Sequence, residues 1–365
     1  MPHAPQPWDR PAPELPDAPR PNAAGLSLED LRDLAASWGE KPFRAQQIFE
    51  GLYQQRWTDW EAFTPLSAPL RARLQRDVDL RWPEIIESAS SQDGSTKHAF
   101  RLSDGACVEG VHMPYDDRAT LCLSSQVGCA MGCTFCATGQ MGIVRNLTPA
   151  EITGQVMAML IHHQHPEGRP VNLVFMGMGE PLHNLDHVMA AFHILTHPKG
   201  LAVPPRRITL STSGLVSGIQ RLGAYHPRPR LAVSLNGTSD DRRSALMPVN
   251  RVWGLDALAH ALAAFPLEKD ERITLEYILL QNETDTDADA RRLVAFAQRF
   301  PAKINLIPFN PHEGTGFAPP SEARIDELGR FLSRQGLTVS VRRSRGQDIA
   351  GACGQLVREK ARPTP

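Results

Sequence analysis

The chain has 365 residues, of which 41% are apolar, and its formal net charge at pH 7 is −1. This length is enough to bury one large core together with a smaller accessory domain. The near-neutral charge excludes a global basic field, so a polyanionic partner would have to be bound by local patches. No stretch approaches the roughly 18 apolar residues that a membrane-spanning helix needs, so we expect no membrane association.

The N-terminal segment is rich in proline and lacks the apolar region of a secretory signal peptide. We therefore predict that residues 1–24 form a disordered, Pro-rich arm. Without an export signal the expected location is cytoplasmic, where thiols stay reduced and persistent disulfides are rare.

Residues 25–95 are predicted to form a small helical domain. Apolar residues recur at helical spacing in 27–37 and 42–54, and Ser27 with Asp30 resembles a capping box. Residues 96–117 alternate between apolar and polar side chains and contain an Asp-Gly turn, which predicts a β-hairpin extension.

From residue 118 to 345, short β-branched or aliphatic runs alternate with helical stretches. The runs lie at 119–125, 171–179, 206–214, 229–237, 271–280, 302–311 and 337–344. Such alternation predicts a parallel sheet with helical crossovers. A full barrel, a partial barrel and an open doubly wound sheet all fit; a barrel is favoured because no G-x-G-x-x-G opens the first helix.

Polar or reactive residues follow the predicted strands, where parallel α/β folds build their sites. The positions after successive strands include Cys129, Cys133, Cys136, Gly179, Glu180, Ser211, Ser234, Asn236, Asn310 and Cys353. Gly, Ser and Asn are also ordinary turn residues. The cysteines are not explained in that way.

Cys129, Cys133 and Cys136 form a C-x3-C-x2-C motif, which supplies three thiolates from one loop. A structural zinc ion needs four closed ligands, and the chain has no second cysteine pair; the nearest alternative is HHQH at 162–165. An iron–sulfur cube held by three cysteines leaves one iron free to bind a substrate. The motif favours a [4Fe-4S] cluster.

The motif, with Phe135 before its last cysteine, resembles the radical S-adenosylmethionine (SAM) superfamily. The resemblance implies a free iron that binds SAM, whose reductive cleavage gives a 5′-deoxyadenosyl radical. The segment FMGMGEP at 175–181 resembles the glycine-rich segment that holds the SAM amino group.

A closer resemblance covers residues 26–356. The segments at 119–148, 175–184, 206–214, 304–311 and 346–356 are similar to the dual-specificity adenine-C2 RNA methyltransferases of the RlmN family. That family methylates an adenosine of 23S rRNA and one beside the anticodon of tRNA. The resemblance implies an α/β fold with a partial (β/α)6-type TIM barrel core at 118–345, an RNA-holding domain at 25–95, and a catalytic-cysteine loop and tail at 346–365.

The resemblance also implies three catalytic residues. Cys353 is methylated by a first SAM, and the radical made from a second SAM activates that methyl group for transfer to adenine. Cys122 then attacks Cys353 and releases the product, leaving a disulfide that must be reduced, so the two Cα atoms must approach within about 7 Å. Glu109 accepts a proton. Alone, each cysteine could be a small buried apolar residue and Glu109 a solvated strand residue.

Seven residues are implied to contact SAM. They are Gly179, Glu180, Ser211, Ser234, Leu235, Asn236 and Asn310. The family commonly has histidine where Asn236 stands; an amide forms hydrogen bonds but carries no charge, so this contact is the least firmly implied. Met176 is expected to line the barrel, and Cys107 to be structural.

The RNA partners would need local positive charge. We predict that Arg342, Arg343 and Arg345 contact backbone phosphate, although a short basic run is also commonly a solvated face. The family further implies an electron donor such as flavodoxin or ferredoxin, and the absence of apolar heptads predicts a monomer. Two alternatives remain: a Cfr-type adenine-C8 methyltransferase and a noncatalytic, metal-stabilised RNA-binding protein.

Overall fold

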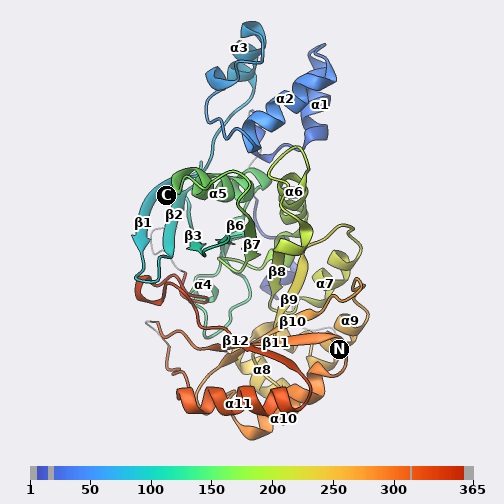
Figure 1. Ribbon diagram of the computed structural model, residues 1–365. Helices are drawn as coiled ribbons and strands as arrows, with labels where there is room; N and C mark the ends of the chain where they lie inside the picture. The colour runs from blue at the N-terminus through green and yellow to red at the C-terminus, as the bar shows by residue number, and fades with distance from the viewer. Residues whose placement is uncertain (1–5, 15–19, 313–314, 357–365) are drawn as a thin grey trace.

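The computed structural model describes residues 6–14, 20–312 and 315–356, and its centre is a ten-stranded sheet (Figure 1). The strands are β1 (Glu84–Ser90), β2 (Thr96–Arg101), β3 (Cys107–Pro114), β4 (Ala119–Leu123), β7 (Val171–Phe175), β8 (Ile208–Thr212), β9 (Arg230–Ser234), β10 (Ile273–Leu279), β11 (Ala302–Pro308) and β12 (Thr338–Val341). They lie side by side in this order. From β4 onwards, neighbours are parallel.

Helical crossovers connect the parallel strands and cover the outside of the curved sheet (Figure 1). They are α5 (Pro149–His162), η4 (Pro181–Asn184), α6 (Leu185–Thr196), η5 (Pro205–Arg207), α7 (Val216–Gly223), α8 (Asp240–Leu246), η6 (Pro248–Arg251), α9 (Leu255–Ala263), α10 (Asp287–Ala297) and α11 (Glu322–Arg334). Because both faces are covered, all of β10 is buried. Among the described strands, β1 and β12 remain unpaired with each other, so the predicted partial barrel is confirmed and is open.

The N-terminal helices form a separate lobe beyond α5 and α6 (Figure 1). The elements are η2 (Ala23–Gly25), α1 (Leu28–Ser37), α2 (Pro42–Tyr53), η3 (Trp60–Ala62) and α3 (Ala68–Asp77). The predicted capping box of Ser27 and Asp30 is present. The lobe has its own core, which includes Met157 of α5 and Ile194 of α6 and so docks the lobe on the barrel.

The helical lobe ends earlier than the predicted boundary at residue 95. Strand β1 pairs antiparallel with β2 and therefore belongs to the sheet. The predicted hairpin is confirmed: β2 and β3 are antiparallel, with Thr96 opposite His112 and Arg101 opposite Cys107. Because β3 also pairs with β4, the extension continues the barrel sheet.

The predicted disordered arm is wrong for the part that the structure describes. Trp8, in η1 (Pro7–Asp9), is only 6% exposed and belongs to the main core. The carbonyl of Pro13 accepts a hydrogen bond from the Asn146 amide at 2.7 Å. The prediction of disorder used the average composition of the segment, and an average does not show that one large aromatic side chain is buried and that a nearby carbonyl is hydrogen-bonded.

Among residues 6–14, 20–312 and 315–356, no helix has both the length and the apolar composition of a membrane span.

Candidate active site

The three-cysteine loop is closed at its base by a short antiparallel ladder. Strands β5 (Gln126–Gly128) and β6 (Ile143–Asn146) flank the loop, and α4 (Ala137–Gln140) follows its last cysteine. Gly128 has φ +75°, and a Cβ atom there would lie 2.0 Å from the Gly142 carbonyl oxygen. Only glycine fits this crossing, so the backbone itself shapes the loop.

The side chains of Cys129, Cys133 and Cys136 line one cavity at the carboxyl ends of the parallel strands, named here the three-cysteine cavity. Its other walls include Met176, Gly177, Gly179, Glu180, Ser211, Ser213, Ser234, Asn236, Glu276 and Cys353. The predicted convergence of separate strand ends on one mouth is therefore confirmed. Leu235 and Asn310 are buried close by but do not line this cavity.

The three cysteines fit a polynuclear cluster better than a single ion. They come from one short loop, and three cysteine ligands leave one iron of a [4Fe-4S] cube open, whereas a structural zinc ion is closed by four ligands. Burial raises the pKa of all three thiols, and Arg243 partly offsets this for Cys133. Thiols in such a place become thiolates when a cationic metal centre binds and displaces their protons.

Glu180 organises the glycine-rich turn after β7. Its carboxylate accepts hydrogen bonds from the amides of Ser213 at 2.7 Å and Leu182 at 3.1 Å, and burial raises its pKa. The preceding Gly179 has φ +101°, and a Cβ there would meet Gln126 at 2.6 Å. Glu180 thus joins the ends of β7 and β8.

Glu276 and Arg243 are site residues that the sequence analysis missed. Glu276, in β10, accepts hydrogen bonds from Ser211 at 3.1 Å and from Arg342 at 3.3 Å. Arg243, in α8, is fully buried and donates to the carbonyls of Leu235 at 2.9 Å and Ser213 at 2.6 Å. For Glu276 the available signal was the one charged side chain in the buried strand β10.

Asn236 serves the backbone as well as the cavity. It adopts φ +50°, a left-handed conformation that asparagine tolerates, and its Oδ1 accepts a hydrogen bond from the Ile278 amide at 3.0 Å. Its Nδ2 lies 3.6 Å from the Met247 sulfur. The amide therefore pins the end of β9 to β10.

A second, smaller cavity contains the other two predicted thiols and is named here the two-thiol cavity. Cys122, Cys353, Met176 and Arg342 line it. Burial raises the pKa of Cys122 to about 12, and burial also raises that of Cys353, with Arg342 acting in the opposite direction on both. Cys353 lines both cavities and so lies between the three-cysteine motif and Cys122.

All six cysteines are free thiols, so the predicted disulfide between Cys122 and Cys353 is not formed here. The loop that carries Cys353 follows η7 (Gln347–Ile349) and docks on the cysteine motif. Ala137 donates its amide hydrogen to the Gly354 carbonyl at 2.8 Å, and Asn310 Nδ2 donates to the Cys353 carbonyl at 3.2 Å. Asn310 therefore positions the thiol-bearing loop.

Glu109 is buried, which excludes a solvated strand residue. Its carboxylate is 3.3 Å from Lys97 Nζ, which also donates to the Ala350 carbonyl at 3.3 Å. Lys97 thus connects Glu109 with the Cys353 loop. Ser124 Oγ donates to the Glu109 carbonyl oxygen at 2.6 Å and anchors β3.

The predicted phosphate-binding patch is wrong as a unit. Arg342 points into the two-thiol cavity, Arg343 pairs with Glu322, and Arg345 donates to the Pro114 carbonyl at 2.5 Å. Successive side chains of a strand point to opposite faces, and the three arginines follow directly after β12. Consecutive basic residues at the end of a strand therefore need not form one surface.

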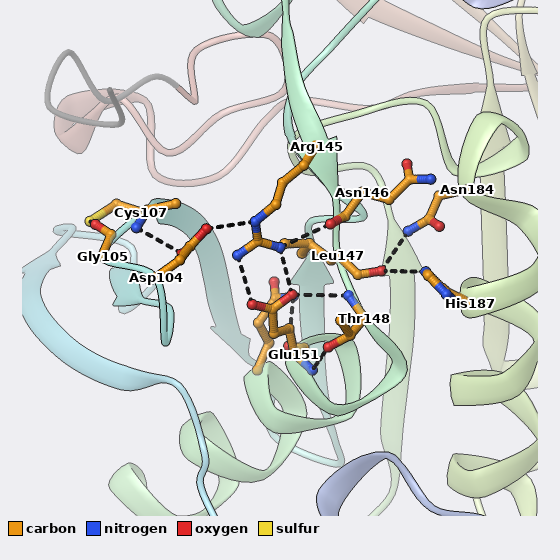
Figure 2. Close-up of polar contacts among 12 residues, drawn as sticks. Asp104, Gly105, Cys107, Arg145, Asn146, Leu147, Thr148, Glu151, Asn184 and His187 are labelled. Atoms are coloured by element: carbon orange, nitrogen blue, oxygen red, sulfur yellow. Dashed lines mark hydrogen bonds and ion pairs between the residues drawn. The ribbon is translucent and has the colours of Figure 1, made fainter. Parts of the chain in front are cut away.

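A buried ion-pair network braces the base of the site (Figure 2). Arg145, in β6, contacts both Glu151 oxygens at 2.8 and 2.9 Å and Asp104 at 2.7 Å. Glu151 also accepts a hydrogen bond from the Thr148 amide at 2.9 Å, which completes the predicted capping box of α5. The network therefore ties the β2–β3 turn, the exit of the cysteine loop and α5 together.

The Radical SAM superfamily model matches residues 123–294, and the Ribosomal RNA large subunit methyltransferase N-terminal domain model matches residues 21–80. A "Dual-specificity RNA methyltransferase RlmN" of Syntrophotalea carbinolica is 48% identical over 91% of this chain and 88% of its own length. The chain belongs to the RlmN family.

Other relatives agree with this assignment. The RlmN of Geobacter sulfurreducens is 48% identical over 91% of both chains. A crystal structure titled as a radical SAM methyltransferase from Sphaerobacter thermophilus superposes with a TM-score of 0.88 at 40% identity, covering 94% of this chain and all of that one. The cofactors of a radical SAM protein are a [4Fe-4S] cluster and SAM, and the three-cysteine cavity has the donor set for the cluster.

Proposed function

We propose that this protein methylates carbon 2 of adenosine in 23S rRNA and in tRNA, in a SAM-dependent reaction. The observation that carries the proposal is the place of Cys353, which lines the three-cysteine cavity and the two-thiol cavity at once. A thiol in that position can accept a methyl group on one side and meet a second thiol on the other. Membership of the RlmN family supports the same activity.

The cluster and SAM supply the radical chemistry, and the chain supplies positioning, proton transfer and product release. Cys129, Cys133 and Cys136 would hold the cluster, while the turn at Gly179 and the end of β8 at Ser211 would hold SAM. The buried residues around both cavities limit the access of water and so protect reactive species. We assign Cys353 as the methyl acceptor.

Three further residues complete this assignment. Arg342 stabilises the Cys353 thiolate, since a nearby cation lowers the pKa of a thiol. Glu109 accepts the proton lost from the adenine carbon. Cys122 then attacks the Cys353 sulfur, so that an S–S bond forms and the bond from that sulfur to the RNA-bound carbon breaks. That carbon takes the bonding electron pair and a proton and becomes the methyl group of the released RNA. The S–S bond oxidises both thiols by two electrons, which an external thiol reductant returns.

Nucleoside mass spectrometry tests the proposal. The cluster-loaded enzyme is incubated with SAM, a reductant and unmodified 23S rRNA or tRNA, and the RNA is digested. We expect 2-methyladenosine from both RNAs. 8-Methyladenosine would instead identify a Cfr-type enzyme, and RNA binding with one tightly held zinc ion and no product would identify a noncatalytic binding protein.

The wider setting follows from the same proposal. The N-terminal lobe would hold RNA, a flavodoxin or ferredoxin would deliver electrons, and the enzyme would act as a cytoplasmic monomer. Because adenine must be unstacked to reach a buried thiol, the RNA would present its target base flipped out. Sedimentation of the purified protein tests the monomer, and reduction by each donor tests the electron source.

A further inference from the structure

A cluster of imidazoles lies on the face of the β2–β3 hairpin that is turned away from Glu109. In the register of this hairpin, His98 and His112 share one face, while Lys97 and Glu109 share the other. The C-terminal end of α5 covers the histidine face and adds His162 and His163. We propose that His98, His162 and His163 bind a zinc-like divalent transition-metal ion that clamps α5 to the hairpin.

The donor atoms are already gathered. One ring nitrogen from each of the three histidines lies within 4.8 Å of the other two. His98 Nε2 and His163 Nε2 are 2.8 Å apart, and tetrahedral zinc with its usual bond lengths to nitrogen would hold them at about 3.3 Å. Small side-chain rotations therefore convert a hydrogen-bonded pair into two ligands.

The surroundings prepare the rings for this role. His98 is fully buried, and its other nitrogen, Nδ1, lies 2.8 Å from Ser88 Oγ. Metal-binding histidines are typically oriented in this way by a partner on the second nitrogen. His112, 6% exposed, stacks on His163 with ring centroids 3.8 Å apart, and its own Nδ1 is buried without a hydrogen-bond partner.

Charge also favours a cation at this point. Burial and the neighbouring histidines lower the pKa of His98 to about 3 and that of His163 to about 4, so both rings are neutral at pH 7 and can offer lone pairs. The end of α5 presents the negative pole of its helix dipole. Neutral imidazole ligands suit zinc, nickel, cobalt and copper better than magnesium or calcium.

The location gives the ion a structural role. The hairpin carries Glu109 on its opposite face, and α5 supplies Gln155, whose Oε1 accepts a hydrogen bond from the Ser124 amide after β4. A clamp between α5 and β2 would therefore hold Glu109 and the strand of Cys122 in register. Since His162 is exposed, the fourth coordination position opens to water.

The test uses the cluster-loaded protein, so that the three cysteines are occupied. Protein stripped with a chelator is titrated with zinc, passed through a desalting column, and analysed for zinc and iron by mass spectrometry. We expect one zinc per chain in addition to the cluster iron, and at least tenfold weaker zinc binding in His162→Gln/His163→Gln. The matched control, His260→Gln, changes an exposed histidine on α9 and should bind zinc as the parent does.

X-ray absorption at the zinc edge identifies the ligands. We expect nitrogen and oxygen neighbours only, and iron content equal in all variants. His162 is exposed, so His162→Gln alone provides a second variant that folds normally, with the same loss of affinity. The proposal would be overturned if the parent protein failed to retain zinc, if the absorption spectrum showed sulfur neighbours, or if both variants bound zinc as tightly as the parent. The iron content separately reports on the cluster assignment.

Discussion

Arg145 and Arg342 are two arginines close to the candidate site that differ in exposure and in how completely carboxylates pair them. Arg145 is 6% exposed in its side chain and is saturated by the carboxylates of Glu151 and Asp104. Arg342 is 32% exposed, has one carboxylate partner in Glu276, and faces two thiols. A fully paired buried charge braces the fold, whereas a partly paired charge beside a cavity remains available for chemistry.

The largest expected effect is the loss of methylation activity when the thiol beside Arg342 is removed. Cys353→Ala should lower methylation more than about 1000-fold, because no other group can replace a covalent acceptor. Its melting temperature should stay close to that of the parent. Nucleoside mass spectrometry and thermal unfolding measure the two quantities. Cys107→Ala, which changes a buried thiol outside both cavities, is the control and should remain active.

Substitutions in the ion-pair network of Arg145 should lower the stability of the fold. Arg145→Met leaves Glu151 buried without its cation and should lower the free energy of unfolding by about 3–5 kcal/mol. Denaturant titration of the cluster-loaded protein measures this. Arg221→Met breaks an exposed ion pair with Asp186 and should cost at most about 1 kcal/mol. Equal losses in the two variants would contradict a bracing role for Arg145.

Arg342 should affect thiol reactivity more than stability. Arg342→Gln should slow alkylation of Cys353 by about 10- to 100-fold, because the pKa of this thiol rises when the neighbouring cation is removed, while Arg342→Lys should keep part of the rate. Iodoacetamide labelling followed by peptide mass spectrometry measures the rate. Arg343→Gln is the control, since Arg343 pairs with Glu322 on the surface. An unchanged rate in Arg342→Gln would remove this arginine from the assignment.

The smallest expected effect is the pH dependence of the stability that Asp104 contributes through its ion pair with Arg145. Burial alone would raise the pKa of Asp104, but hydrogen bonds from Arg145 and the Ala106 amide outweigh it and lower the pKa below the ordinary 3.8. This carboxylate therefore stabilises the fold above the ordinary pKa, and the contribution is lost as pH falls through the lowered value. Asp104→Asn should lower stability at pH 7 by about 1 kcal/mol or less.

The difference between the parent and Asp104→Asn should shrink below pH 4 as Asp104 becomes protonated. Unfolding curves at several acidic pH values measure it. A difference that is constant from pH 7 to pH 2 would show that the charge of Asp104 contributes nothing.

Local features of the fold were predictable because their signals are local. The capping boxes of Ser27 and Thr148 depend on residues three positions apart, and each parallel strand appears as its own apolar run. The meeting of cysteines, glycines and serines at one mouth followed from a topological rule, and the family resemblance supplied candidate roles. The burial of Trp8 was not predicted, because its segment is anchored by this single residue and the average composition of the segment does not show it.

The sequence by itself therefore determined the barrel, the three-cysteine motif and the family. Tertiary structure decided which polar side chains meet: Arg342 with Glu276, Arg145 with Asp104, and His98 with His163. These partners lie 66, 41 and 65 positions apart. Such pairings depend on how helices and strands pack, since the direction of a long side chain is set by its neighbours in space and not by its neighbours in the chain.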